Sequence, residues 1–100
     1  MAPNFPFFIA GRPVTDGNVR EVRSPFDGHL VGTYPAPSDA DIEAAVGAAV
    51  ASVPRSRGLT AAARARALDH ISTAIAARAD EYAALISGEN GKPMMWAKAE

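Results

Sequence analysis

The chain has 100 residues, with 10 basic side chains, 11 acidic side chains and no cysteine. This length allows one small domain with a modest core. The near-neutral charge gives no reason to expect nucleic acid or a charged membrane surface as a partner. The absence of cysteine excludes a disulfide scaffold and a cysteine-based zinc site.

Neither a signal sequence nor a membrane anchor is apparent. No apolar run approaches the ~18 residues that span a bilayer. The start of the chain has no basic segment and is interrupted by Pro3 and Pro6, unlike a secretory signal. We therefore expect a cytoplasmic protein. Eight of the ten basic residues are arginine and 22 residues are alanine, a bias typical of a GC-rich bacterial coding background.

The first third of the chain has the pattern of β-strands. Residues 7–10 form a short apolar run, which Gly11-Arg12-Pro13 is expected to end. Apolar and charged side chains alternate over residues 19–24, as in a half-exposed strand. Asp27-Gly28 is typical of a type I′ hairpin turn, and residues 29–34 provide the returning strand. These features predict a two- or three-stranded antiparallel ribbon within residues 7–34.

After the connector Pro35-Ala36-Pro37, the pattern changes to that of a helix. Ser38 is the expected N-cap, and acidic residues in the first turn suit the helix dipole. Apolar residues then recur at helical spacing, at Ile42, Ala45, Val46, Ala49, Val50 and Val53. We expect a helix over residues 39–53 that ends at Pro54, followed by a polar loop at residues 55–58.

Further helices are predicted over residues 60–78, over residues 80–89 and from residue 93 onward. Thr60 is the next N-cap candidate, and Asp80 is the candidate restart. A single helix of ~30 residues is the alternative to the two middle helices. Gly91 is expected to hold a left-handed backbone conformation, with Pro93 opening the last helix. The chain thus divides into a ribbon with its connector, residues 1–37, and a helical part, residues 38–100.

The residues do not form a recognisable catalytic or phosphate-binding motif. Gly91-Lys92 lacks both the earlier glycine and the following Ser or Thr of a phosphate-binding loop, and no Gly-x-Gly-x-x-Gly run occurs. Glu89, Lys92 and Glu100 have no neighbours in the sequence that would tune them for acid–base work.

The remaining polar candidates are better explained as structural. His29 and His70 are too isolated to share a metal ion. The basic group Arg55, Arg57, Arg64 and Arg66 is interpreted as a solvated face or a set of intrachain salt bridges, since no aromatic residues interleave with it. An Arg-rich nucleic-acid-binding helix is the alternative. We assign no catalytic, cofactor-binding or metal-binding residue to the chain.

Several spaced motifs resemble the N-terminal region of NAD(P)-dependent aldehyde dehydrogenases. Phe8-Ile9-Ala10-Gly11 is similar to the opening strand of that family. Ser24-Pro25-Phe26-Asp27-Gly28 resembles its Asn-Pro-x-Thr-Gly turn, with Ser and Asp in place of Asn and Thr. The first helix carries the family's Ala-Val pair at Ala45-Val46. Further matches are Arg64, Leu68, Arg78, Glu81, Leu85, Glu89, Gly91, Lys92, Pro93, Ala97 and Glu100. The chain departs from the family at Val53-Pro54-Arg55, where a Trp is frequent.

This resemblance implies an α/β parent protein with a Rossmann-like cofactor-binding domain, of which the chain is the N-terminal part. The 100 residues themselves would be an α+β segment, a β-ribbon followed by several helices, that supports the cofactor-binding domain. The parent would be a homo-oligomeric oxidoreductase that oxidises an aldehyde with NAD or NADP through a Cys thiohemiacetal. The chain alone lacks that Cys and is expected to be inactive. A non-catalytic interaction or structural module on the same scaffold is the alternative.

Overall fold

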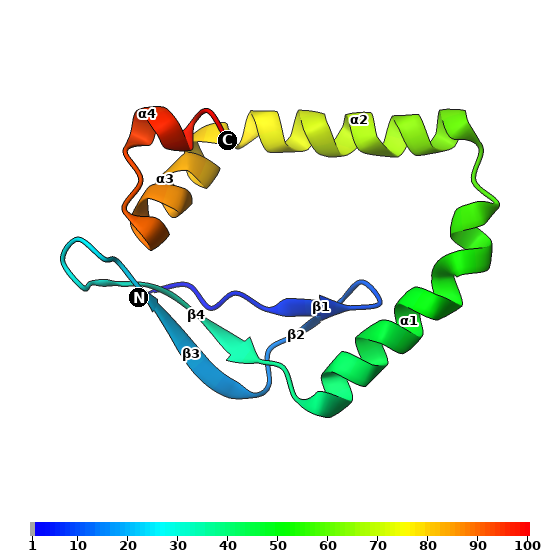
Figure 1. The fold of residues 1–100 in the computed structure, drawn as a ribbon, viewed down its shortest axis with the longest axis horizontal. Coiled ribbons are helices and arrows are strands. Elements are labelled where there is room, and N and C mark those ends of the chain that lie inside the picture. Colours follow the sequence, from blue (N-terminus) through cyan, green and yellow to red (C-terminus); the bar gives the residue numbers. More distant parts are fainter. Residues whose placement is uncertain (1) are drawn as a thin grey trace.

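The computed structural model describes residues 2–100 as a flat, open frame (Figure 1). Its elements are β1 (Phe7–Ile9), β2 (Arg12–Val14), β3 (Asn18–Arg23), β4 (Leu30–Ala36), α1 (Asp39–Arg57), α2 (Ala61–Ala77), α3 (Ala79–Asn90) and α4 (Met94–Ala97). The strands form one side of the frame, α1 and α2 form two further sides, and α3 and α4 fill the corner where the frame closes. The predicted order, a β-ribbon followed by helices, is confirmed.

The β region consists of two separate antiparallel pairs, β1–β2 and β3–β4. The first strand ends before Gly11, as predicted, but Arg12 and Pro13 belong to a further strand, β2, that the sequence pattern did not reveal. Ala10 and Gly11 both have positive φ, 50° and 76°, so the chain reverses within two residues. Two successive positive φ values define the type I′ turn that suits hairpin twist. Pro13 is tolerated because a two-stranded ribbon consists only of edge strands.

The turn of the second hairpin, between β3 and β4, is not of the predicted type. Only Gly28 has positive φ in this turn, at 75°, whereas Asp27 does not, so a type I′ turn at Asp27-Gly28 is excluded. The turn is longer, because the last backbone bonds of the hairpin run from Ser24 N–H to the His29 carbonyl and from Gly28 N–H to the Ser24 carbonyl, both 2.9 Å. His29 therefore precedes β4, which begins at Leu30.

Residues 3–5, here called the N-terminal strap, cover the outer edge of β4. The Thr33 N–H donates to the Pro3 carbonyl at 2.9 Å, and the Phe5 N–H donates to the Thr33 carbonyl at 2.7 Å. The Phe5 ring lies so close to Gly32 that a Cβ built there would be 2.7 Å from it. A side chain at position 32 would therefore displace the Phe5 ring, and the sequence pattern did not reveal this contact.

The start of α1 is confirmed and its end is not. Ser38 Oγ accepts a hydrogen bond from the Asp41 N–H at 3.1 Å, and the Ser38 N–H donates to Asp41 Oδ2 at 2.8 Å, which completes a capping box. The helix then passes through Pro54 and ends at Arg57. Proline lacks an N–H donor, but the last turn still closes because the Gly58 N–H donates to the Pro54 carbonyl at 3.1 Å.

The helices α2 and α3 are separate, so the single long helix is excluded. Arg78 adopts φ −116° and ψ 21°, outside the helical range, and ends α2. Its guanidinium then donates to both carboxylate oxygens of Glu81, at 2.8 and 2.6 Å, and lies 5.2 Å from the centre of the Tyr82 ring. The hydrogen bonds from Arg78 hold the pKa of Glu81 below its ordinary value. Arg78 therefore fixes the start of α3 as well as the end of α2.

The end of α3 rests on the second hairpin. Gly91 has φ 76° and donates its N–H to the Ser87 carbonyl at 2.9 Å, so the predicted left-handed conformation is confirmed. A Cβ at Gly91 would lie 3.1 Å from Pro25 Cγ, and one at Gly88 would lie 3.7 Å from Val31. This contact between the hairpin and the C-terminal turn of α3 is called the joint below.

We predict opposite effects for alanine at two glycines. Gly91→Ala should lower the free energy of unfolding by about 1–2 kcal/mol, because an L-residue is strained at this positive φ. Gly47 lies inside α1, and a Cβ added there would meet nothing within 4 Å, so Gly47→Ala should raise it by about 0.5–1 kcal/mol. Urea unfolding followed by circular dichroism measures both. Equal effects of the two substitutions would contradict the role given to Gly91.

The capping box predicts a pH dependence at the start of α1. Hydrogen bonds from the backbone N–H and then the hydroxyl of Ser38 hold the pKa of Asp41 below its ordinary value of 3.8. A lowered pKa stabilises the folded state above the ordinary value, and this stabilisation is lost as the pH falls through the lowered pKa. Amide chemical shifts of the first turn should therefore change below that ordinary value. Asp41→Asn should remove the change, whereas Asp39→Asn, without a cap bond, should preserve it.

Candidate functional site

Both lysines near the C-terminal end are engaged in ion pairs. Lys92 pairs with Glu100, and Lys98 Nζ lies 3.1 Å from Asp80 Oδ1. Glu89 lies exposed at the end of α3. The structure thus brings Lys92 and Glu100 together as an ion pair. A structural tie across the α3–α4 corner is the role this pair supports.

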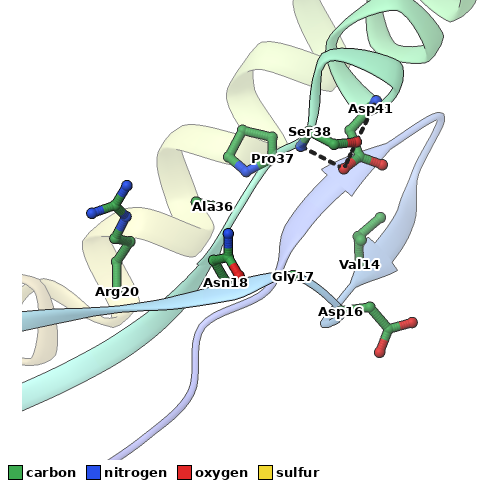
Figure 2. A pocket seen from close by; sticks show the side chains of 9 residues that line it. All are labelled: Val14, Asp16, Gly17, Asn18, Arg20, Ala36, Pro37, Ser38 and Asp41. Carbon is green, nitrogen blue, oxygen red and sulfur yellow. Dashed lines mark hydrogen bonds between the residues drawn. The ribbon is translucent and has the colours of Figure 1, made fainter.

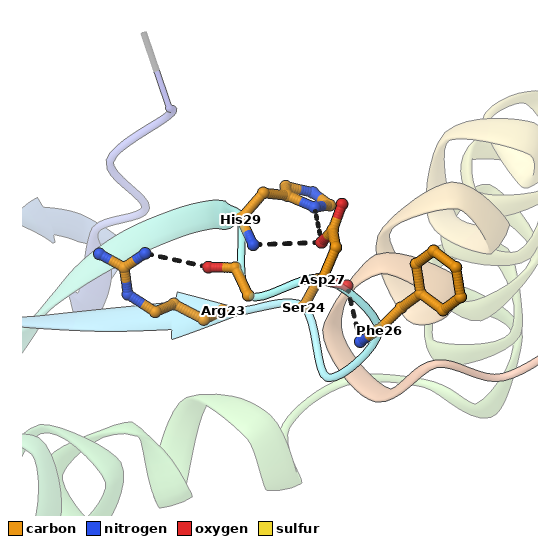
Figure 3. A network of polar contacts seen from close by, with 6 residues as sticks. Arg23, Ser24, Phe26, Asp27 and His29 are labelled. Carbon is orange, nitrogen blue, oxygen red and sulfur yellow. Dashed lines mark hydrogen bonds and ion pairs between the residues drawn. The ribbon is translucent and has the colours of Figure 1, made fainter.

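Of the two histidines, His29 makes its contacts within the second hairpin turn. His29 Nδ1 lies 2.6 Å from Asp27 Oδ1, and the same oxygen accepts from the His29 N–H at 3.1 Å (Figure 3). Arg23 Nη1 donates to the Gly28 carbonyl at 3.0 Å, so the turn is braced from both of its strands. His70 lies exposed on α2. Within residues 2–100 no group of three His, Cys, Asp or Glu residues could hold a metal ion.

The arginine group lies where α1 ends and α2 begins. All four of its side chains are exposed, and Arg64 Nη2 donates to the Ser56 carbonyl at 3.1 Å. That bond links α2 to the end of α1 across their connection. The predicted intrachain role therefore suits Arg64 best.

A shallow depression of about 580 Å³ lies where the second ribbon meets the start of α1 (Figure 2). Its lining consists of Val14, Asp16, Gly17, Asn18, Arg20, Ala36, Pro37, Ser38 and Asp41. A dinucleotide would need a helix N-terminus free to bind its pyrophosphate. Here Ser38 caps that terminus, and the carboxylates of Asp39 and Asp41 in the first turn would repel phosphate. These residues do not fit NAD or NADP, so no cofactor contact is assigned to them.

The most unusual feature is apolar surface that nothing covers. Among residues 2–100, Ala83, Ala97 and Pro35 are the buried apolar side chains. The radius of gyration is 17.0 Å, whereas a compact chain of this length has about 13 Å. A frame this open has no core of its own that could hold its helices in place.

The uncovered surface lies on α1 and α2. It is defined here as the helix surface, made of Ile42, Val46 and Val50 on α1 and Leu68, Ile71 and Ile75 on α2, each at least half exposed. The neighbouring face of α1 is apolar too, because Ala45, Ala48 and Ala49 border a cavity of about 270 Å³ against β1. A helix that is apolar on more than one face is normally packed between two layers. Within residues 2–100, the layer that α1 packs against is the β1–β2 ribbon.

In the part of the chain that the structure describes, no helix has the length and hydropathy needed to cross a membrane.

Comparison with known proteins identifies this architecture. The sequence profile of the aldehyde dehydrogenase family matches residues 13–100. The chain belongs to the aldehyde dehydrogenase family. Two bacterial relatives agree with this assignment. A 3,6-anhydro-alpha-L-galactose dehydrogenase of Streptomyces coelicolor is 37% identical over 95 residues, which are 93% of this chain and 19% of the relative. A glutarate-semialdehyde dehydrogenase of Pseudomonas putida is 33% identical over 85 residues, 85% of this chain and 18% of the relative.

Solved aldehyde dehydrogenase structures contain the same frame. Aldehyde dehydrogenase 21 from Physcomitrella patens, crystallised with its reaction product succinate, superposes with a TM-score of 0.95 at 26% identity. Lactaldehyde dehydrogenase from Escherichia coli superposes with a TM-score of 0.92 at 31% identity. Each match covers 99% of this chain and 21% of the other. This aldehyde dehydrogenase chain thus spans about a fifth of the length of its relatives.

The Asp27–His29 pair predicts a measurable titration. The hydrogen bond from the His29 side chain, followed by that from its N–H, holds the pKa of Asp27 below its ordinary value of 3.8. The hairpin turn should lose this contribution as the pH falls through the lowered pKa. His29→Ala should shift the pKa of Asp27 upward, as read by carboxyl carbon NMR. His70→Ala, on exposed α2, should leave it unchanged; an equal shift in both variants would contradict the pairing.

Proposed function

We propose that this chain is the N-terminal part of an enzyme that oxidises an aldehyde to a carboxylic acid with NAD or NADP. Family membership supports aldehyde oxidation. The match of nearly the whole frame to solved aldehyde dehydrogenases supports the proposal that the chain is one part of such an enzyme. The resemblance also favours a cytoplasmic, bacterial homo-oligomer whose partner is a small aldehyde, without nucleic acid or membrane.

The chain's own role in this proposal is to brace the cofactor-binding domain. Its helix surface would pack against protein that lies outside the 100 residues, and α1 would then have a layer on each apolar side. The joint links the second ribbon to α3, and the N-terminal strap covers the edge of β4. Small alanine side chains on α1 permit close approach of neighbouring elements, which suits a tightly packed layer.

The chemistry itself would come from elsewhere in the enzyme. Aldehyde oxidation by this family's mechanism needs a thiolate, and the 100 residues contain no cysteine. No described cavity offers converging polar groups for a dinucleotide. Loss of the brace would therefore lower the amount of folded enzyme rather than alter an individual chemical step.

The proposal is tested by an activity comparison. The purified 100-residue chain should show no NAD(P)-dependent oxidation of any aldehyde, whereas a protein that contains this segment at full family length should show it. The panel should include small aldehydes, semialdehydes and sugar aldehydes, with both cofactors. Turnover by the chain alone, or none by the longer protein across the panel, would reject the proposal in favour of a non-catalytic module.

The bracing role makes a separate prediction for the chain alone. Its exposed helix surface should bind a hydrophobic dye and self-associate with rising concentration, because uncovered apolar patches of this kind promote association. Val50→Ser combined with Ile71→Ser should reduce both signals. Ala51→Ser with Ala67→Ser, outside the defined surface on the same helices, serves as the matched control. A sharp, concentration-independent monomeric transition of the unmodified chain would show that no further layer is needed.

A further inference from the structure

One strand of the second ribbon has an open edge. Thr33 gives both its N–H and its carbonyl to the N-terminal strap, and it lies opposite Glu21 in the β3–β4 pair. The pair Glu21–Thr33 is therefore not hydrogen-bonded across the ribbon, and the N–H and carbonyl of Glu21 point away from β4. Within residues 2–100 no strand is paired with that outer edge of β3.

The outer edge of β3 is also regular. The register shift places the extra residue, Val31, in β4, because Val22 pairs with Gly32 and Arg23 pairs with Leu30. Ser24 bonds inward to the hairpin through both its N–H and its carbonyl. By alternation, the outward-pointing backbone groups on this strand are those of Val19, Glu21 and Arg23.

Two of these outward residues carry opposite charges. Arg23 Nη2 lies 2.8 Å from Glu21 Oε2, and both side chains are about half exposed, 54% and 50%. Charges on an edge strand usually prevent pairing with other strands. Here Glu21 and Arg23 lie two residues apart on the same strand, so one register of pairing between two copies of β3 places opposite charges across from each other.

We propose that β3 is a pairing edge for a second copy of this chain, in an antiparallel two-fold arrangement centred on Val22. Glu21 then lies opposite Arg23 of the second copy, and Arg23 lies opposite the second copy's Glu21. These two residue pairs supply four backbone hydrogen bonds, and each charge gains an opposite charge across the strands. Registers centred on Arg20 or Glu21 would instead place like charges opposite each other.

The pairing stops at two copies. The N-terminal strap already occupies the outer edge of β4, so the combined sheet has no second open edge of the same kind (Figure 1). A closed pair results rather than a growing fibre. A contact of one strand with another is smaller than the ~1,000 Å² of a stable interface, so the pair is weak and reversible by itself. The inference does not depend on the proposed enzymatic activity.

Disulfide trapping tests this geometry, since the chain has no cysteine of its own. In the proposed register the two copies of residue 22 form a non-hydrogen-bonded pair with Cα atoms about 4.5 Å apart, within disulfide range. The two copies of residue 20 would be about 13 Å apart. Val22→Cys should therefore cross-link under mild oxidation at least about tenfold faster than Arg20→Cys. Equal rates would mean nonspecific association and would overturn the proposal.

Charge reversal in trans provides the second measurement. In the Val22→Cys background, Glu21→Arg alone or Arg23→Glu alone places like charges opposite each other and should slow cross-linking about tenfold. An equimolar mixture of the two variants restores opposite charges across the strands and should cross-link at the original rate, mainly as the mixed dimer. Circular dichroism checks that each variant keeps its secondary structure. A mixture no faster than its components would reject the register.

Discussion

The arrangement of the whole frame depends on the joint between the second hairpin and the end of α3. At this point Gly91, in a left-handed conformation, lets the backbone approach Pro25, while Gly88 leaves room for Val31. The helices α1 and α2 extend away from the ribbons and return only through α3. Without a close contact at this corner, the helices would meet the ribbons only through α1, at its start and along its contact with β1. Two glycines thus set the geometry of a structure that has almost no buried core.

The small number of buried apolar side chains is the observation that bears most directly on function. Burial of apolar surface is the main favourable term in folding, yet the six aliphatic side chains of the helix surface remain at least half exposed. Polar bonds hold local features in place, such as the capping box and the Arg78–Glu81 fork, but such exposed contacts contribute little to overall stability. A segment of this kind gains its stability from what it packs against. This agrees with a brace inside a larger aldehyde dehydrogenase.

The two edges of the second ribbon are protected in different ways. The N-terminal strap covers one edge with two backbone hydrogen bonds and the Phe5 ring. The opposite edge carries an ion pair and exposed arginines in place of a covering strand. The two edges of one ribbon therefore differ in chemistry: one is satisfied within the chain, and the other is selective for a partner that matches its charges.

The sequence by itself determined the local features. Helical periodicity, the caps at Ser38 and Thr60, the left-handed Gly91 and the family were all readable, because each depends on neighbouring residues or on spaced motifs. The tertiary structure alone decided the type I′ turn at Ala10-Gly11, the passage of α1 through Pro54 and the strap on β4. It also decided that no element within residues 2–100 covers the helix surface. These outcomes depend on pairing and packing between residues far apart in the chain, which local propensity does not describe.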